Sequence, residues 1–279
     1  MVKLPAVARA AVIFSLAHVL LTTNAAHAER QYLLSSPLSR PVVRVMANYY
    51  ASHGQYGSGT GLLVGRCDVL VTARHVAEGP NGFQPSALEV YSPQIRGRVV
   101  DVVNAPEARA IWPEKRADAV AGNLDADLAV LRLSECPTHT SLPLDQLRAL
   151  EFSDLKAMKT VGYPCDGRAH RGPEHVALSG QYLRLNRSLG LSRKIRLTPG
   201  ARPGQSGSPI YVLKPGHAPA VGMILVATAR DTATPIGCAQ DPQTGQSEAG
   251  HAAFGAVLTT RFIENLRHYI RALNRSQAP

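Results

Sequence analysis

The sequence predicts an all-β protein whose chain ends in a single α-helix, and two patterns support this prediction. Many short apolar segments are bounded by Gly, Pro, Asn, Asp and Ser with no helical pattern alternating between them, which is typical of a β-sandwich or β-barrel. Only the last segment has apolar residues at helical spacing. A chain of 279 residues, 45% of them hydrophobic, can bury a sizeable core in one or two such units.

The strand pattern recurs along most of the chain. In order, it covers residues 42–47, 59–65, 69–72, 98–103, 127–133, 159–163, 175–185, 194–198, 209–213, 220–227 and 252–258. Turn-forming and charged residues predict loops at 78–85, 105–124 and 230–249. The apolar pattern thins between Leu142 and Leu155, so we expect the boundary between two barrels in this stretch.

The closing helix is expected over residues 261–273. Phe262, Leu266 and Ile270 recur at helical spacing, whereas Arg271 lies on the opposite side. We therefore expect this helix to pack its apolar face against the barrels.

Residues 1–28 have the features of a secretory signal peptide. Lys3 and Arg9 supply a positive start, an apolar run of about a dozen residues follows, and Ala26-His27-Ala28 offers small residues for cleavage. The run is shorter than the roughly 20 residues that span a bilayer, so no retained membrane anchor is expected. We predict a secreted or periplasmic protein, with residues 29–40 as its mature N-terminal segment or a short propeptide.

Charge and cysteine content restrict the partners and cofactors. The net charge is +10, and a basic run lies between Arg184 and Arg196, but aromatic residues make up only 5% of the chain. Without aromatic residues for base stacking, no nucleic-acid partner is expected. The four cysteines of an exported chain predict two disulfides, with three pairings open. They show no metal-ligand spacing, so no metal site is expected.

The segment from Pro203 to Pro209 is the strongest local signal. It reads Pro-Gly-Gln-Ser-Gly-Ser-Pro and puts Ser206 between glycines, just before an apolar strand. Such a tight turn lets the backbone approach a substrate carbonyl. A serine hydroxyl is a poor nucleophile unless a base removes its proton, so this prediction needs a base elsewhere in the chain.

His75 and Asp127 are the candidate partners of Ser206. His75 follows the apolar segment Val69-Leu70-Val71-Thr72 and the short turn Ala73-Arg74. An imidazole can take up a proton and return it near neutral pH. Asp127 begins a buried strand, from which its carboxylate can orient the imidazole. Asp125 is an alternative, but Asp127 directly adjoins the strand.

Three segments together resemble the chymotrypsin-like serine peptidases. Thr72-Ala73-Arg74-His75-Val76, Asp127-Leu128-Ala129-Val130-Leu131 and Gly204-Gln205-Ser206-Gly207-Ser208-Pro209 look like that family's histidine, aspartate and serine blocks, in the same chain order. Ser208 in place of a second glycine and the Val161-Gly162-Tyr163-Pro164 segment are more similar to the bacterial branch that includes the glutamyl endopeptidases. The resemblance covers residues 41 to 273.

The resemblance implies a fold with two six-stranded antiparallel β-barrels and a C-terminal α-helix. The serine peptidase domain would span residues 41–274, with barrel one at about 41–145, barrel two at about 155–260 and the helix after them. It also implies a secreted serine endopeptidase that hydrolyses protein or peptide substrates through an acyl-enzyme, without a cofactor.

The family's catalytic roles map onto single residues of this chain. Ser206 would attack the scissile carbonyl, His75 would act as general base and then acid, and Asp127 would orient His75. The backbone N–H groups of Gly204 and Ser206 would form the oxyanion hole.

The same resemblance points to the substrate pocket. Gly200 occupies the pocket base, so the acidic residue of trypsin-like specificity is absent, and Ile224 stands where the glutamyl branch has a histidine, on a strand that also carries Ala227. A small or medium apolar substrate side chain and an acidic one recognised by Arg202 both remain open. Gln205 replaces the aspartate whose ion pair activates the animal zymogens, so that activation route is not expected.

The cysteines fit the implied fold. Cys67 and Cys136 flank the strands that carry His75 and Asp127, which should be antiparallel neighbours, so we expect these two to pair and Cys165 to pair with Cys238. The oligomeric state is not predicted. A non-catalytic binding or adhesion module on the same scaffold is the alternative function, because a fold alone does not guarantee an activity.

Overall fold

The computed structural model describes residues 36–50, 55–78, 87–91, 99–101, 127–164, 174–183, 194–201, 204–228 and 251–276. The predicted signal peptide, the predicted loops at 105–124 and 230–249, and Cys165 and Cys238 lie outside these residues. In the described part of the chain, no helix is both long and apolar enough to cross a bilayer.

The first half of the fold is a six-stranded antiparallel sheet. Its strands are β1 (Val42–Tyr50), β2 (Gln55–Leu63), β3 (Val69–Thr72), β4 (Ala87–Tyr91), β5 (Val99–Asp101) and β6 (Ala129–Arg132). They are ordered β5-β4-β1-β2-β3-β6. The order puts β3 and β6 side by side, although a long stretch of sequence separates them.

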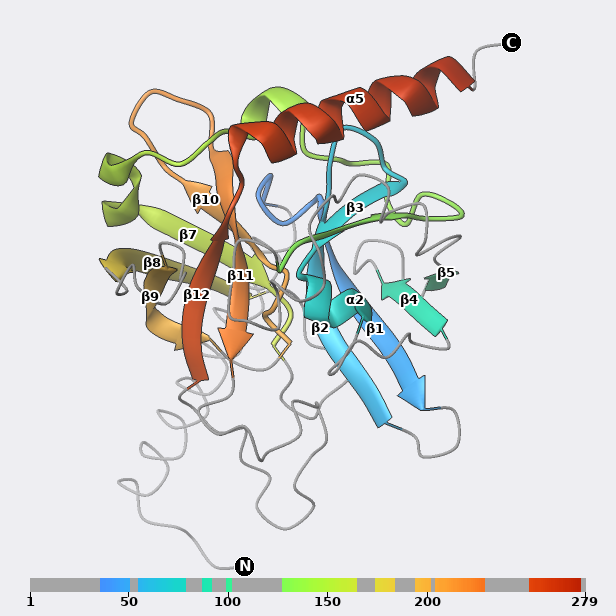
Figure 1. Ribbon diagram of the computed structural model, residues 1–279, viewed down its shortest axis with the longest axis horizontal. Helices are drawn as coiled ribbons and strands as arrows, with labels where there is room; N and C mark the ends of the chain where they lie inside the picture. The colour runs from blue at the N-terminus through green and yellow to red at the C-terminus, as the bar shows by residue number, and fades with distance from the viewer. Residues whose placement is uncertain are drawn as a thin grey trace, which may run out of the picture.

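The second half is a closed antiparallel barrel. Its strands are β7 (Met158–Gly162), β8 (Glu174–Leu183), β9 (Lys194–Ala201), β10 (Pro209–Val212), β11 (Ala220–Thr228) and β12 (His251–Val257). They follow the order β10-β11-β12-β9-β8-β7 around the barrel. Figure 1 shows the two sheets next to each other, with the C-terminal helix lying across both.

The predicted fold class is confirmed: two six-stranded antiparallel units with a C-terminal helix. One strand, β4, was not predicted from the sequence. It pairs with β1 through Val45 and Val90, and Val90 is fully buried. A segment of five residues is too short for its alternation of apolar and polar residues to distinguish a strand from a loop. β4 is therefore identified as a strand only through its pairing with β1.

A connecting segment joins the two units. It contains two short 3-10 helices, η3 (Leu144–Gln146) and η4 (Phe152–Lys156). Leu142 forms a bridge with Val64 beside the first sheet, and Leu147 forms one with Val221 of β11. Residues 133–157 thus connect β6 of the first sheet to β7 of the barrel.

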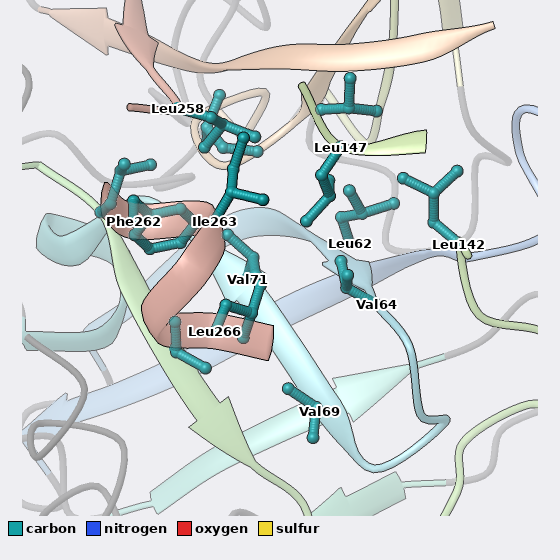
Figure 2. Close-up of a cluster of buried hydrophobic side chains, with 14 of the residues drawn as sticks. Leu62, Val64, Val69, Val71, Leu142, Leu147, Leu258, Phe262, Ile263 and Leu266 are labelled. Atoms are coloured by element: carbon teal, nitrogen blue, oxygen red, sulfur yellow. The ribbon is translucent and has the colours of Figure 1, made fainter. Parts of the chain in front are cut away.

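Helix α5 (Thr260–Ser276) packs against the core between the two sheets. Thr259, the residue before the helix, accepts a hydrogen bond on its hydroxyl from the Phe262 N–H at 3.1 Å, as a serine or threonine N-cap does. The buried face of the helix carries Phe262, Ile263, Leu266, Ile270 and Leu273. Figure 2 shows part of this face packed with residues of the first sheet, including Leu62 and Val71.

The chain before β1 is also part of the fold. Ser36 to Arg40 form turns, and the Leu38 carbonyl accepts a hydrogen bond from the Tyr211 hydroxyl of β10 at 2.8 Å. Tyr163, after β7, donates its hydroxyl to the Val42 carbonyl at 3.3 Å. Both contacts tie the start of the described chain to the second unit.

Candidate active site

Strand pairing brings the histidine and the aspartate together. β3 and β6 are antiparallel, and Thr72 at the end of β3 faces Ala129 at the start of β6. His75 lies three residues beyond Thr72, in the short helix α2 (Arg74–Glu78), and Asp127 lies two residues before Ala129. The chain leaving β3 and the chain entering β6 therefore meet at the same sheet end.

Asp127 contacts His75 through both of its carboxylate oxygens. Oδ2 lies 2.7 Å from the imidazole Nδ1, and Oδ1 accepts the His75 backbone N–H at 2.9 Å. The Asp127 side chain is 13% exposed and that of His75 is 30% exposed. The carboxylate is thus shielded, while one side of the imidazole remains accessible. Asp125, the alternative from the sequence, lies outside the described residues.

The two groups shift each other's pKa. Burial opposes the charged form of each residue, but the mutual charge interaction and hydrogen bond outweigh it. As a result, the pKa of His75 is raised above its ordinary 6.5 and the pKa of Asp127 is lowered below its ordinary 3.8, helped by backbone N–H groups of Arg74 and His75. The carboxylate is therefore ionised near neutral pH and stabilises a positive charge on the imidazole.

The serine lies in a turn built by two left-handed glycines. Gly204 has a φ of 84° and Gly207 has a φ of 90°, backbone angles that residues other than glycine rarely adopt. The Ser208 N–H donates to the Gln205 carbonyl at 3.0 Å, which closes the turn around Ser206. We call residues 204–208 the serine loop.

Strand β11 of the second barrel holds the far side of the serine loop. The Gly207 N–H donates to the Leu225 carbonyl, and the Leu225 N–H donates to the Ser208 carbonyl, both at 2.8 Å. Ser206 itself is buried, with 4% exposure. The second barrel thus holds the end of the loop that follows Ser206 through backbone hydrogen bonds.

Glycines on both sides allow the histidine segment and the serine loop to approach closely. A Cβ on Gly59 would collide with the Val76 side chain at 2.5 Å and would lie 3.0 Å from the Ser206 carbonyl oxygen. The neighbour of His75 and the backbone of Ser206 therefore lie against the same glycine of β2. The structure thus brings the segments that carry His75, Asp127 and Ser206 to one place.

The predicted pocket residues are described unevenly. Ile224 is fully buried and belongs to the core between the two sheets. Gly200 lies in β9 and Ala227 lies in β11, where it pairs with Ala253 of β12. Arg202 lies outside the described residues. The pocket therefore stays a prediction.

The structure contains the predicted disulfide between Cys67 and Cys136. Their Cα atoms are 4.9 Å apart, and the bridge joins chain segments separated by 69 residues. Cys67 precedes β3 and Cys136 follows β6, so the bridge ties together the ends of the strand pair opposite His75 and Asp127. The predicted partners Cys165 and Cys238 cannot be compared, since they lie outside the described residues.

Sequence reasoning missed Thr60 and Thr72, two buried threonines that contact the serine loop. The Thr60 hydroxyl donates to the Gly204 carbonyl at 2.9 Å, and the Thr72 hydroxyl donates to the Thr60 carbonyl at 2.6 Å. The available signal was the pair of glycines around Thr60 within a strand, because strand glycines often mark a close approach of another backbone.

The double antiparallel fold and the Asp127–His75 pair beside a glycine-flanked serine are features of the serine proteases. The model of the trypsin-like peptidase domain matches residues 59–218, more than half of the chain. The chain therefore belongs to the family of trypsin-like peptidase domains and is a serine-type peptidase. The glutamyl endopeptidase branch is not established by this match.

Solved structures agree on the fold. A thermostable serine protease, AL20, from an extremophilic microorganism is 14% identical, with a TM-score of 0.54 over 84% of this chain and 98% of that one. The protease Anisep from Arthrobacter nicotinovorans is 12% identical, with a TM-score of 0.56 over 85% of this chain and 98% of that one. A search of curated proteins finds no match.

Proposed function

We propose that this protein is a secreted serine endopeptidase that hydrolyses peptide bonds with Ser206, His75 and Asp127. The observation that carries the proposal is the 2.7 Å contact between Asp127 Oδ2 and His75 Nδ1, beside the turn that holds Ser206. Because Asp127 takes Nδ1, the opposite ring nitrogen Nε2 is left to accept a proton from the serine.

The proposed acylation step needs only groups of this chain. Ser206 Oγ attacks the substrate carbonyl carbon while its proton moves to His75 Nε2. The resulting oxyanion would accept hydrogen bonds from the N–H groups of Gly204 and Ser206, each worth about 3 kcal/mol of barrier lowering. The C–N bond then breaks as Nε2 returns the proton to the departing amine, leaving an acyl-enzyme.

Deacylation repeats the same chemistry with water. His75 Nε2 takes a proton from water, the hydroxide oxygen attacks the acyl carbon, and the proton returns to Ser206 Oγ as the ester bond breaks. The raised pKa of His75 makes its protonated form easier to reach in both steps. The ionised Asp127 stabilises that form without itself taking up a proton.

We further propose that the enzyme binds its substrate through Gly200, Arg202, Ile224 and Ala227. Ile224 is fully buried in the core between the two sheets, so the preference for a small or medium apolar substrate side chain over an acidic one is proposed from the sequence alone. Membership of the bacterial glutamyl branch is proposed from the sequence of the serine loop, of residues 161–164 and of residues 254–258 with the closing helix. Secretion is proposed from residues 1–28, and the Cys67–Cys136 disulfide is consistent with an oxidising compartment.

The test is labelling of the purified mature protein with a fluorescent fluorophosphonate, beside Ser206→Ala and His75→Ala. Labelling of the wild type alone, together with cleavage of fluorescently quenched casein, would support the proposal. Folded wild-type protein that neither labels nor cleaves casein would contradict it and would favour the non-catalytic binding module.

A further inference from the structure

Thr60 of β2 contacts the serine loop from the first sheet, whereas the rest of the loop is held by the second barrel. Thr60 is fully buried. Its N–H donates to the Ser206 carbonyl at 2.7 Å, and its hydroxyl donates to the Gly204 carbonyl at 2.9 Å. One residue thus holds both the carbonyl that precedes Gln205 and the carbonyl that follows the Ser206 Cα.

The Thr60 hydroxyl also contacts a third segment. Its oxygen accepts the N–H of Tyr163, just beyond β7, at 2.9 Å. The hydroxyl therefore donates one hydrogen bond and accepts another, and its orientation is set by two backbone groups. It joins β2, the end of β7 and the serine loop at a point from which water is excluded.

The chain of contacts continues toward His75. The β2–β3 ladder ends at the Gly61–Thr72 pair, and beyond it the Thr72 hydroxyl donates to the Thr60 carbonyl at 2.6 Å. Thr72 is fully buried and lies three residues before His75. A Cβ on Gly207 would collide with the Thr60 carbonyl and the Thr72 hydroxyl, so the serine loop packs directly on both threonines.

We propose that Thr60 is a positioning residue for the reaction and that Thr72 supports it. This inference rests on the proposed function of Ser206, His75 and the N–H groups of Gly204 and Ser206. The hydrogen bonds to the Gly204 and Ser206 carbonyls fix the peptide planes that join each of these residues to the next one. The N–H groups of Gly204 and Ser206 lie in neighbouring peptide planes that share a Cα with the fixed ones. The same hydrogen bonds therefore limit the rotation that would turn these two N–H donors away from the oxyanion.

Coupling between the two halves follows from the same contacts. The histidine and aspartate come from the first sheet, and the serine loop is bonded to the second barrel. Thr60 is hydrogen-bonded to the serine loop, and Thr72, the last residue of the strand that leads to His75, is hydrogen-bonded to Thr60. Small displacements of a reacting group can cost about 100-fold in rate, so a hydroxyl that fixes the relative position of the halves affects catalysis without touching substrate.

The test compares Thr60→Val, which keeps the side-chain shape but lacks the hydroxyl, with Thr60→Ser, which keeps the hydroxyl. The readout is the second-order rate constant for fluorophosphonate labelling, per mole of folded protein, as a function of pH. We expect Thr60→Val to label about 100-fold more slowly than the wild type, with the pH midpoint unchanged. Thr60→Ser should label within about threefold of the wild type.

Thr160→Val is the matched control. Thr160 is also a buried threonine, 1% exposed, whose hydroxyl donates to a backbone carbonyl at 2.9 Å, but that carbonyl belongs to Pro209, outside the serine loop. A general loss of stability would affect both valine variants alike. Only Thr60→Val should label slowly once rates are corrected for the folded fraction.

A folded Thr60→Val protein that labels within about threefold of the wild type would overturn the inference. If Thr60→Val does not fold, Thr72→Val decides: labelling about tenfold slower than the wild type supports the inference, and an unchanged rate overturns it. An inactive wild type would remove the proposed function and this inference together. An active wild type with an unaffected Thr60→Val removes the inference alone.

Discussion

Asp127 holds His75 by two bonds at once: its Oδ2 lies 2.7 Å from the imidazole Nδ1, and its Oδ1 accepts the His75 backbone N–H at 2.9 Å. The first contact sets which ring nitrogen faces outward. The second fixes the backbone that carries the ring. A substitution of Asp127 therefore disturbs both the charge and the position of the imidazole.

The pH dependence of labelling should follow the raised pKa of His75. Only the neutral imidazole can accept the serine proton, so labelling should increase with pH through a midpoint above the ordinary 6.5. In Asp127→Asn the negative charge that raises the pKa of His75 is removed, whereas the burial that lowers it remains, so the pKa of His75 should fall. Imidazole NMR titration of Ser206→Ala, with and without Asp127→Asn, measures this shift. Equal midpoints in the two variants would contradict it.

The rate of Asp127→Asn should fall as well. An asparagine no longer stabilises the imidazolium and can hold the wrong tautomer, which costs about 10⁴-fold in turnover in enzymes of this mechanism. Casein cleavage per mole of folded protein measures the loss. A variant that retains nearly full activity would show that Asp127 is not the orienting acid.

Gly207→Ala and Gly216→Ala should differ sharply, although both glycines have positive φ angles of 90° and 74°. At Gly216, in the β10–β11 turn, a Cβ meets nothing within 4 Å, so backbone strain of about 1 kcal/mol is the expected cost. At Gly207 the Cβ would also collide with Thr60 and Thr72, so labelling should be lost. Thermal unfolding and labelling of both variants test this, and an active Gly207→Ala would contradict the packing.

Asp154 should stabilise the connection between the two halves in a pH-dependent way. Its side chain is fully buried, with Oδ1 2.7 Å from Arg148 Nη2 and 3.2 Å from Lys214 Nζ. Burial raises its pKa, but the Glu151 N–H, Lys214 and Arg148 together lower it below 3.8. We expect Asp154→Asn to lower the free energy of unfolding by about 1–3 kcal/mol near neutral pH.

A lowered carboxyl pKa contributes stability above the ordinary value, and this contribution is lost as the pH falls through the lower, folded-state value. The difference between wild type and Asp154→Asn should therefore shrink in acid below pH 3.8. Asp145→Asn, at an exposed aspartate of η3, is the matched control and should change stability little. Urea unfolding across pH measures both, and a gap that is constant with pH would contradict the ion-pair explanation.

The Cys67–Cys136 disulfide should contribute substantially to stability. It closes a loop with a sequence separation of 69, for which loop entropy gives about 4 kcal/mol. The double variant Cys67→Ala/Cys136→Ala should unfold at a lower guanidinium concentration than the wild type. Adding a thiol reductant should then lower the guanidinium midpoint of the variant less than that of the wild type. An equal decrease in both proteins would argue against this bridge.

Most of the strands and the closing helix were predictable because their signals are local. Val69–Thr72 is an uninterrupted β-branched and apolar run, and its observed bounds equal the predicted ones. α5 was expected at 261–273 and extends from Thr260 to Ser276, since its helical spacing is regular. Pairing of β3 with β6 followed from the family resemblance, and with it the position of Cys136 near Cys67.

The contacts that organise the serine loop were not predictable in this way. Thr60 reaches Tyr163 and Gly204, which are 103 and 144 residues further along the chain. No window of sequence contains both ends of such a contact, and a threonine in a strand is unremarkable by composition. Asp154 was missed for the same reason, because its partner Lys214 lies in the turn after β10.

The place of α5 in the core has a consequence for how the protein is made. Phe262, Leu266 and Ile270 complete the same apolar core that contains Leu62 of β2, two residues from Thr60. α5 follows the described strands along the chain, so synthesis delivers both sheets before the helix that covers the core they share. A polypeptide that has emerged only as far as β12 therefore exposes this apolar surface to solvent.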